Sequence, residues 1–284
     1  MIRLVAIDID GTLLDSRWQL PDRNREAICA AVGAGVEVAI VTGRRYDFAR
    51  PILDLLPCPV TAIVSNGAIV RSPDGATELR RLLAREVARA VLDATRAYRD
   101  GAALIFDRPH DGQVVFERID WAHPSRRGYA ERNRAFIIEV EPIEAALTED
   151  PIQVMFNGSV SPMRGLVDLL RALPSSAGFT VAVTEYLERD FSLVDVLPAG
   201  CTKGSTLAEW ARRRGYEREE VMALGDNLND MEMLEAAGLP VVMGNAVPAL
   251  RARGWPTTSS HDDAGVGRAI ETYVLSAPSA RPSS

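Results

Sequence analysis

The sequence predicts an α/β fold in which a core built on a parallel sheet is interrupted by a separate α+β module. Short apolar runs alternate with amphipathic helical stretches towards both ends of the 284-residue chain. This alternation is typical of parallel strands joined by crossover helices. Between about residues 86 and 185 it gives way to hairpins mixed with helices. Polar residues follow directly after the apolar runs of the core, where parallel sheets bind their ligands.

The first part of the core is assigned to residues 1–82. Its three predicted strands are RLVAID, VEVAIV and VTAIV, and the helical stretches between them are DRNREAICAAVGAG and RYDFARPILDLL. The strands lead into the polar segments DIDGT, TGR and SNG. Because the carboxyl ends of parallel strands share one edge of a sheet, these segments predict a binding site at that edge.

The inserted module is assigned to residues 83–187. It is expected to contain the helices EVARAVLDATRAY and SPMRGLVDLLRAL and the strands AALIFD, QVVFERI, FIIEVE, IQVMFN and TVAVTE. The core is expected to resume over residues 188–276 with the strands FSLVDVLP, EVMAL and LPVVM and the helices KGSTLAEWARRRG, MEMLEAAG and GVGRAIETYVL. Residues 277–284 are expected to be a disordered tail because they are poor in apolar side chains.

Composition and charge exclude several classes of protein. The hydrophobic content of 47% and charged content of 25% are ordinary for a soluble globular protein. Acidic residues interrupt the first apolar run before a signal-peptide core can form, so a cytoplasmic location without membrane partners is expected. A net charge of -7 argues against binding to nucleic acid. The three widely spaced cysteines, Cys29, Cys58 and Cys201, are expected to be reduced thiols.

Two pairs of acidic residues follow predicted parallel strands. Asp8 and Asp10 lie two residues apart, a spacing that puts both carboxylates on one side of an extended chain. Such a pair commonly holds a divalent metal or divides the roles of acid and nucleophile, and an acidic turn before a helix is the simpler alternative. Asp226 and Asp230 in GDNLND form the second pair. Four carboxylates at one sheet edge require a hard cation, most simply Mg²⁺.

Two further features lie at the same predicted edge. Thr42 and Gly43 follow the second strand and suit an anionic group such as a phosphoryl group; the simpler alternative is that Thr42 caps the next helix. Lys203 is the one lysine among 32 basic residues, the others being arginine. A single lysine can survive by chance in a solvated loop. A site that needs a compact ammonium, which arginine cannot supply, is the competing interpretation.

In this order, the segments DIDGTLL, VTGR, the KGST lysine and GDNLND resemble the four motifs of the haloacid dehalogenase superfamily. The SNGA segment, the inserted module and the run from VVMGNAVPAL to HDDAGVGRAI resemble its Cof-type branch. The resemblance implies a Rossmann-like parallel-sheet core with an inserted α+β cap domain, the large α/β cap called type IIB. It also implies that an aspartate is transiently phosphorylated.

Roles follow from the resemblance by position. Asp8 would be the nucleophile and Asp10 the general acid and base, with Lys203 and Thr42 completing the catalytic set. Mg²⁺ would be bound by Asp8, the backbone carbonyl of Asp10 and Asp226. The residues expected to contact phosphate or substrate are Ile9, Thr42, Gly43, Arg44, Asn66, Lys203 and Asn229. Asp230 would either bind a metal water or orient Lys203.

The resemblance implies a Mg²⁺-dependent phosphatase of small phosphorylated metabolites, because the second aspartate, Asp10, distinguishes phosphatases from ATPases in this superfamily. The protein is expected to be a monomer or a weak homodimer. Alternatives are a specialised phosphatase of the sucrose-phosphate or mannosylglycerate-phosphate type, a phosphomutase, and a catalytically silent ligand-binding protein. A P-loop enzyme is excluded because Lys203 precedes its glycine. Candidate substrate contacts in the cap, for which an ordinary surface position is the alternative, are Arg108, His110, His123 and Arg126.

Overall fold

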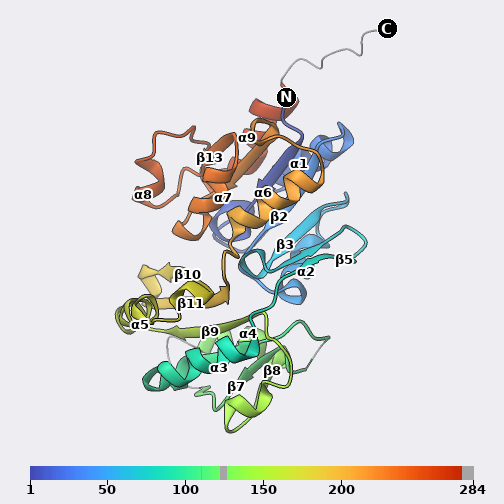
Figure 1. Cartoon of the computed structure of the whole chain (residues 1–284). Helices are drawn as coiled ribbons and strands as arrows, with labels where there is room; N and C mark the ends of the chain where they lie inside the picture. The colour runs from blue at the N-terminus through green and yellow to red at the C-terminus, as the bar shows by residue number, and fades with distance from the viewer. Residues whose placement is uncertain (110, 122–126, 277–284) are drawn as a thin grey trace. The chain divides into compact units, whose positions relative to one another are not determined.

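The computed structural model describes residues 1–109, 111–121 and 127–276. It divides into two compact units. The first comprises Met1–Arg80 together with the chain from Thr202 onward, and the second is Arg81–Cys201. In Figure 1 the first unit is coloured blue to cyan and orange to red, whereas the second is green to yellow. The predicted division into a core and an inserted module therefore has a counterpart in the contacts of the chain.

The first unit is built on a seven-stranded sheet in the order β13-β12-β1-β2-β3-β4-β5. Neighbouring strands from β13 to β3 are parallel, and β4 and β5 add an antiparallel hairpin. The hairpin is absent from the sequence prediction because its strands are short, with three and four residues. The strands are β1 (Leu4–Ile7), β2 (Glu37–Val41), β3 (Thr61–Val64), β4 (Ile69–Arg71), β5 (Thr77–Arg80), β12 (Val221–Gly225) and β13 (Leu239–Val242).

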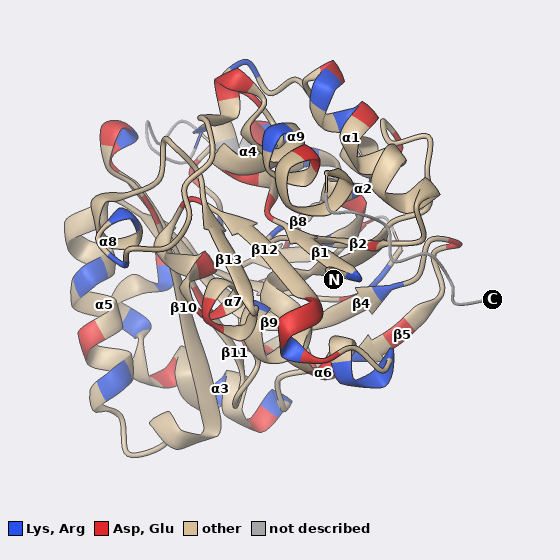
Figure 2. Ribbon diagram, turned by 90° about the horizontal axis from the view of Figure 1, so that it is seen from above, with Lys and Arg blue, Asp and Glu red and all other residues tan. Residues whose placement is uncertain are grey.

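Helices cover both faces of this sheet. In Figure 2, α1, α2 and α9 lie on one side of β13, β12, β1 and β2, and α6 and α7 lie on the other. Because both faces of β1 are covered, all four of its residues are buried and its sequence is a continuous apolar run. The helices of this unit are α1 (Asp22–Gly33), α2 (Tyr46–Leu53), α6 (Lys203–Arg213), α7 (Met231–Ala236), α8 (Pro248–Arg251) and α9 (Gly265–Ile270).

The second unit is built on a six-stranded sheet in the order β10-β11-β9-β6-β7-β8. One apolar cluster, which includes Phe106, Phe156 and Leu166, packs this sheet against its helices. The strands are β6 (Ala102–Ile105), β7 (Val114–Phe116), β8 (Ile137–Glu139), β9 (Gln153–Gly158), β10 (Phe179–Tyr186) and β11 (Phe191–Pro198). The helices are α3 (Arg85–Ala94), α4 (Arg127–Asn133) and α5 (Val160–Ala172). Among the described helices of both units, none is long and apolar enough to cross a membrane.

The predicted end of the inserted module is wrong. The segment FSLVDVLP, expected to return to the core, forms β11 and pairs antiparallel with both β9 and β10 in the second sheet. An apolar strand fits either sheet, so its own residues do not show where it pairs. The short turn Leu187–Arg189, with Asp190 in the left-handed conformation, folds the chain back onto β10 and decides the pairing. The predicted tail, residues 277–284, lies outside the described residues.

The prediction of three reduced thiols is also contradicted. Cys29 on α1 and Cys58 in the segment before β3 form a disulfide, with their Cα atoms 5.5 Å apart. The crossover from α1 through β2 and α2 brings the two cysteines together, although 29 residues separate them in the sequence. Cys201 is buried and takes no part in a disulfide.

Candidate active site

Asp8 follows the last residue of β1 and is almost fully buried, with 4% of its surface exposed. The chain then turns through the irregular segment Ile9–Leu13, in which Gly11 has a φ of 81°. A Cβ atom at Gly11 would lie 2.4 Å from Oδ2 of Asp226. Only glycine therefore permits both the left-handed turn and the close approach of this segment to the end of β12.

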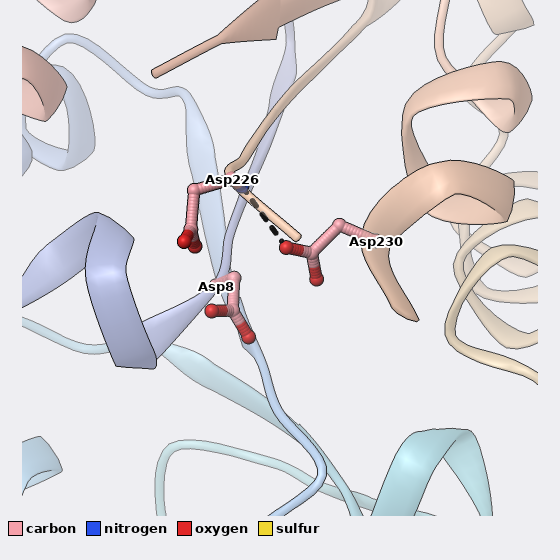
Figure 3. Close-up of side chains that lie close together, drawn as sticks. All are labelled: Asp8, Asp226 and Asp230. Carbon is pink, nitrogen blue, oxygen red and sulfur yellow. Dashed lines mark hydrogen bonds between the residues drawn. The ribbon is translucent and has the colours of Figure 1, made fainter. Parts of the chain in front are cut away.

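Three carboxylates meet at the ends of β1 and β12. Asp8, Asp226 and Asp230 offer oxygen atoms that all lie within 4.8 Å of one another. Figure 3 shows the three side chains converging from different segments of the chain. Oδ1 of Asp226 also accepts a hydrogen bond from the hydroxyl of the buried Thr12 at 2.9 Å. The sequence analysis did not single out Thr12, although it belongs to the DIDGT segment.

Lys203 is the first residue of α6 and is 2% exposed. Its Nζ donates hydrogen bonds to Oδ1 of Asp8 at 2.6 Å and to Oδ1 of Asp230 at 2.7 Å. The side chains of Thr202 and Ser205 form a reciprocal capping box that fixes the start of this helix. A cation at a helix N-terminus opposes the helix dipole, so the buried ammonium depends on its two carboxylate partners.

Asp230 uses both of its oxygens. Oδ1 binds Lys203, and Oδ2 accepts backbone hydrogen bonds from Asp226 at 3.0 Å and Asn227 at 3.1 Å. The dashed line in Figure 3 marks the bond from Asp226. Asp230 therefore connects the turn after β12 to the start of α6, and its contacts are those of a residue that orients Lys203.

The charges in this cluster are unbalanced. Three carboxylates and one ammonium carry a formal charge of −2 when all are ionised. Burial, together with the charge of Asp230, raises the pKa of Asp8 to about 7. Burial and the charges of Asp230 and Asp8 also raise the pKa of Asp226 well above its usual value. Burial alone would lower the pKa of Lys203, but Asp230 and Asp8 raise it. Clustered carboxylate oxygens with excess negative charge fit a Mg²⁺ ion.

Thr42 and Asn66 connect the ends of β2 and β3. The Thr42 hydroxyl accepts a hydrogen bond from the backbone of Arg44 at 3.1 Å, and the Thr42 carbonyl accepts one from the backbone of Asn66 at 3.1 Å. The next helix begins only at Tyr46, with Arg45 at its N-cap, so the alternative that Thr42 caps this helix is wrong. Thr42 instead stabilises the turn that contains Gly43, and both Thr42 and Asn66 are buried.

Arg44 binds a residue that the sequence analysis did not assign to it. Its Nε donates to Oδ2 of Asp10 at 2.8 Å, and its Nη2 donates to Oδ1 at 2.6 Å. The guanidinium carbon lies 5.1 Å from the centre of the Trp18 ring and 5.0 Å from that of Phe48. Arg44 was predicted to contact substrate, whereas in the structure it contacts Asp10. No sequence motif pointed to Trp18 or Phe48.

The remaining predicted residues lie as follows. Ile9 is buried in the turn after Asp8, and Asn229 is half-buried in the short turn Leu228–Asp230. In the second unit, Arg108 pairs with Glu149 and stacks on Phe106, with its guanidinium carbon 3.9 Å from the ring centre. These contacts are those of a surface ion pair. His110, His123 and Arg126 lie outside the described residues.

Comparison with known proteins decides the family. A family described as haloacid dehalogenase-like hydrolase matches residues 5–270. The chain belongs to the haloacid dehalogenase superfamily. The predicted family, fold class and hydrolase class are thereby confirmed. A sugar phosphatase of haloacid dehalogenase subclass IIB has the same fold, with a TM-score of 0.74 and 20% identity over 95% of this chain and 98% of the other.

Two relatives of this haloacid dehalogenase-like chain are named phosphatases. One is the 5-amino-6-(5-phospho-D-ribitylamino)uracil phosphatase YwtE of Bacillus subtilis, 27% identical over 96% of this chain and 98% of its own length. The other is the pyridoxal phosphate phosphatase YbhA of Escherichia coli, 30% identical over 88% of this chain and 91% of its own length. Because the relatives match almost end to end, they share both the core and the inserted module with this chain.

Proposed function

We propose that this protein is a Mg²⁺-dependent phosphatase that hydrolyses small phosphomonoesters through a phosphorylated Asp8. The observation that carries the proposal is the buried contact of Asp8 with Lys203, next to Asp226 and Asp230. A carboxylate fixed by an ammonium at the carboxyl end of a parallel sheet is placed as a nucleophile would be. The phosphatase names of the two relatives support the same activity.

In the first step, a carboxylate oxygen of Asp8 attacks the phosphorus atom in line with the ester oxygen. The bond between phosphorus and the ester oxygen breaks, and Asp10 donates a proton to that oxygen as it leaves. Lys203 holds Asp8 and offsets the negative charge of the approaching phosphoryl group. The products of this step are a free alcohol and an aspartyl-phosphate on Asp8.

In the second step, water attacks the phosphorus atom of the aspartyl-phosphate. Asp10, now a carboxylate, takes a proton from that water, and the bond between phosphorus and Asp8 breaks. The products are inorganic phosphate, free Asp8 and a protonated Asp10. A single aspartate can serve both steps because the proton that it loses in the first is regained in the second.

Mg²⁺ would be held by Asp8 and Asp226, with the backbone carbonyl of Asp10 as a further ligand. When bound, the ion supplies positive charge that draws the phosphoryl group towards Asp8 and stabilises charge on its oxygens. We assign to Asp230 the role of orienting Lys203, because both of its oxygens are engaged in that cluster. We assign the phosphoryl oxygens to the turns that carry Ile9, Thr42, Gly43, Asn66 and Asn229.

For the substrate we propose a small phosphorylated metabolite, with the second unit acting as the cap that selects the leaving group. The relatives are named for a phosphorylated pyrimidine and for pyridoxal phosphate, and the structural neighbour for sugar phosphates. A cofactor phosphate, a nucleotide and a sugar phosphate are therefore all in range. The cytoplasmic location and the monomeric or weakly dimeric state stay predictions.

The decisive experiment measures phosphate release from a panel of sugar phosphates, nucleotides, pyridoxal phosphate and flavin mononucleotide in the presence of Mg²⁺. We expect release from at least one class of substrate, and no release by the Asp8→Asn variant, which lacks the nucleophile. Activity that survives in Asp8→Asn would refute the mechanism. Release from no substrate would favour a ligand-binding protein, and isomerised product in phosphorus NMR would favour a mutase.

A further inference from the structure

Asp10, Arg44 and the rings of Trp18 and Phe48 form a cluster that we call the arginine clamp. We propose that Arg44 is a positioning residue that holds Asp10 for proton transfer, and that the two rings fix the guanidinium in place. The proposal rests on the proposed function, in which Asp10 donates a proton to the leaving group. It replaces the predicted contact between Arg44 and substrate.

The geometry of the pair is that of an orienting contact. Arg44 binds both carboxylate oxygens of Asp10, at 2.8 and 2.6 Å, through two different nitrogen atoms. A two-point contact between planar groups fixes direction as well as distance. The Arg44 side chain is 11% exposed and that of Asp10 is 26% exposed, so the pair is only partly accessible to water.

The two aromatic rings explain how the guanidinium stays in place. Phe48 lies on α2, and Trp18 lies in the loop that follows the irregular segment Ile9–Leu13. Trp18 has a φ of 62°, and 44% of its surface is exposed. Oδ1 of Asp15 holds this loop by accepting hydrogen bonds from the backbone of Arg17 at 2.9 Å and of Gln19 at 2.8 Å. A guanidinium over the face of an aromatic ring is attracted by the negative charge of that face, so the two rings hold Arg44 from different segments.

The test compares two substrates that differ in how much their leaving group needs a proton. The leaving group of an alkyl phosphate that the wild type hydrolyses is an alkoxide, whose departure depends on the acid. The leaving group of p-nitrophenyl phosphate is a stabilised phenolate, which departs without a proton. For Arg44→Ala we expect kcat/KM, which reports the step in which the leaving group departs, to fall about 100-fold on the alkyl phosphate and only a few-fold on p-nitrophenyl phosphate. Asp10→Asn is expected to show the same selectivity in kcat/KM, with a larger loss.

Two graded variants and a control complete the experiment. Arg44→Lys keeps the charge but not the two-point contact, so we expect it to lose about 10-fold on the alkyl phosphate. Trp18→Leu removes one ring of the clamp and is expected to show a smaller selective loss. Arg253→Ala is the matched control, because Arg253 also stacks on a tryptophan, Trp255, and pairs with a carboxylate, Glu235, outside the clamp.

The possible outcomes separate this proposal from the proposed function. Equal losses of kcat/KM on the two substrates, an unchanged kcat/KM, or a rise in KM alone for Arg44→Ala would overturn the positioning role while the wild type remains an active phosphatase. A rise in KM alone would assign Arg44 to substrate binding instead. If the wild type released phosphate from no alkyl phosphate and not from p-nitrophenyl phosphate, the proposed function would fail and this proposal with it.

Discussion

At the scale of single residues, the site depends on how each charge is compensated. Lys203 is buried at a helix N-terminus, where it is tolerated because Asp8 and Asp230 both bind it. Asp10 has a cationic partner of its own, Arg44. Two aspartates two residues apart thus have different cationic partners, which suits the proposed roles of nucleophile and acid.

We expect Lys203→Arg to lose about 100-fold or more in kcat while the protein remains folded. A guanidinium keeps the charge, but it is wider than an ammonium and cannot contact both carboxylates at the observed distances of 2.6 and 2.7 Å. Steady-state kinetics on the best substrate of the panel measure the loss. Arg213→Lys, an exposed position on the same helix, is the control and should retain full activity. Near-normal turnover in Lys203→Arg would disprove the role of the ammonium.

At the scale of elements, the start of α6 shows how packing between helices places a catalytic group. The capping box of Thr202 and Ser205 fixes the first turn of the helix. A Cβ atom at Gly204 would lie 2.2 Å from the backbone oxygen of Glu232 on α7. The glycine after Lys203 therefore lets α6 approach α7, and this approach brings the ammonium to Asp230.

We expect Gly204→Ala to lower the free energy of unfolding by about 1–3 kcal/mol, because the backbone of α7 must move to admit the new methyl group. Activity should fall as well, since α6 carries Lys203. Gly33→Ala is the control, because a Cβ atom there would have no neighbour within 4 Å. Chemical denaturation of both variants gives the comparison. Equal stability of Gly204→Ala and wild type would show that the two helices are not packed as closely as described.

The disulfide between α1 and the segment before β3 supports a second prediction about elements. A disulfide between cysteines 29 positions apart restricts the unfolded chain. In that view, loss of the disulfide lowers the free energy of unfolding by about 3–4 kcal/mol. We expect reduction, or the pair of changes Cys29→Ser and Cys58→Ser, to lower the midpoint of thermal unfolding. Cys201→Ser, at a buried cysteine outside the disulfide, controls for loss of a buried thiol. Mass spectrometry should detect two fewer free thiols in the untreated protein than in the reduced protein.

At the scale of the whole molecule, the unbalanced charge of the site makes stability depend on pH and on Mg²⁺. The pKa of Asp8 is raised to about 7, and that of Asp226 is raised well above its usual value. A carboxyl group whose pKa is higher in the folded state contributes stability below its unfolded pKa, near 4, and loses it as pH rises through the folded value. At Asp8 the metal-free protein should therefore lose stability from about pH 4 to about pH 7, and the raised pKa of Asp226 gives a dependence of the same sign.

If Mg²⁺ binds the ionised carboxylates of the folded state as proposed, it should reverse this loss. A concentration of about 100 times the dissociation constant adds about 2.7 kcal/mol. We expect the Mg²⁺-induced rise in the thermal midpoint to be larger at about pH 8 than at about pH 5, where protons compete for Asp8. Scanning calorimetry of wild type and Asp226→Asn measures the effect. A rise that is the same at both pH values, or unchanged in Asp226→Asn, would contradict a carboxylate metal site.

The sequence by itself determined the parallel strands of the core, the family and the candidate residues, because apolar runs and motifs are local patterns. Asp8, Asp10, Lys203 and Asp226 each lie within such a motif. Tertiary structure alone decided which residues pair. It decided the place of β11 in the second sheet, the partners of Lys203, the contact of Arg44 with Asp10 and the disulfide. Each of these contacts joins segments that are distant in sequence or are oriented by packing. A local pattern specifies which chemical groups a strand end carries, whereas the crossovers and close helix contacts determine which groups touch.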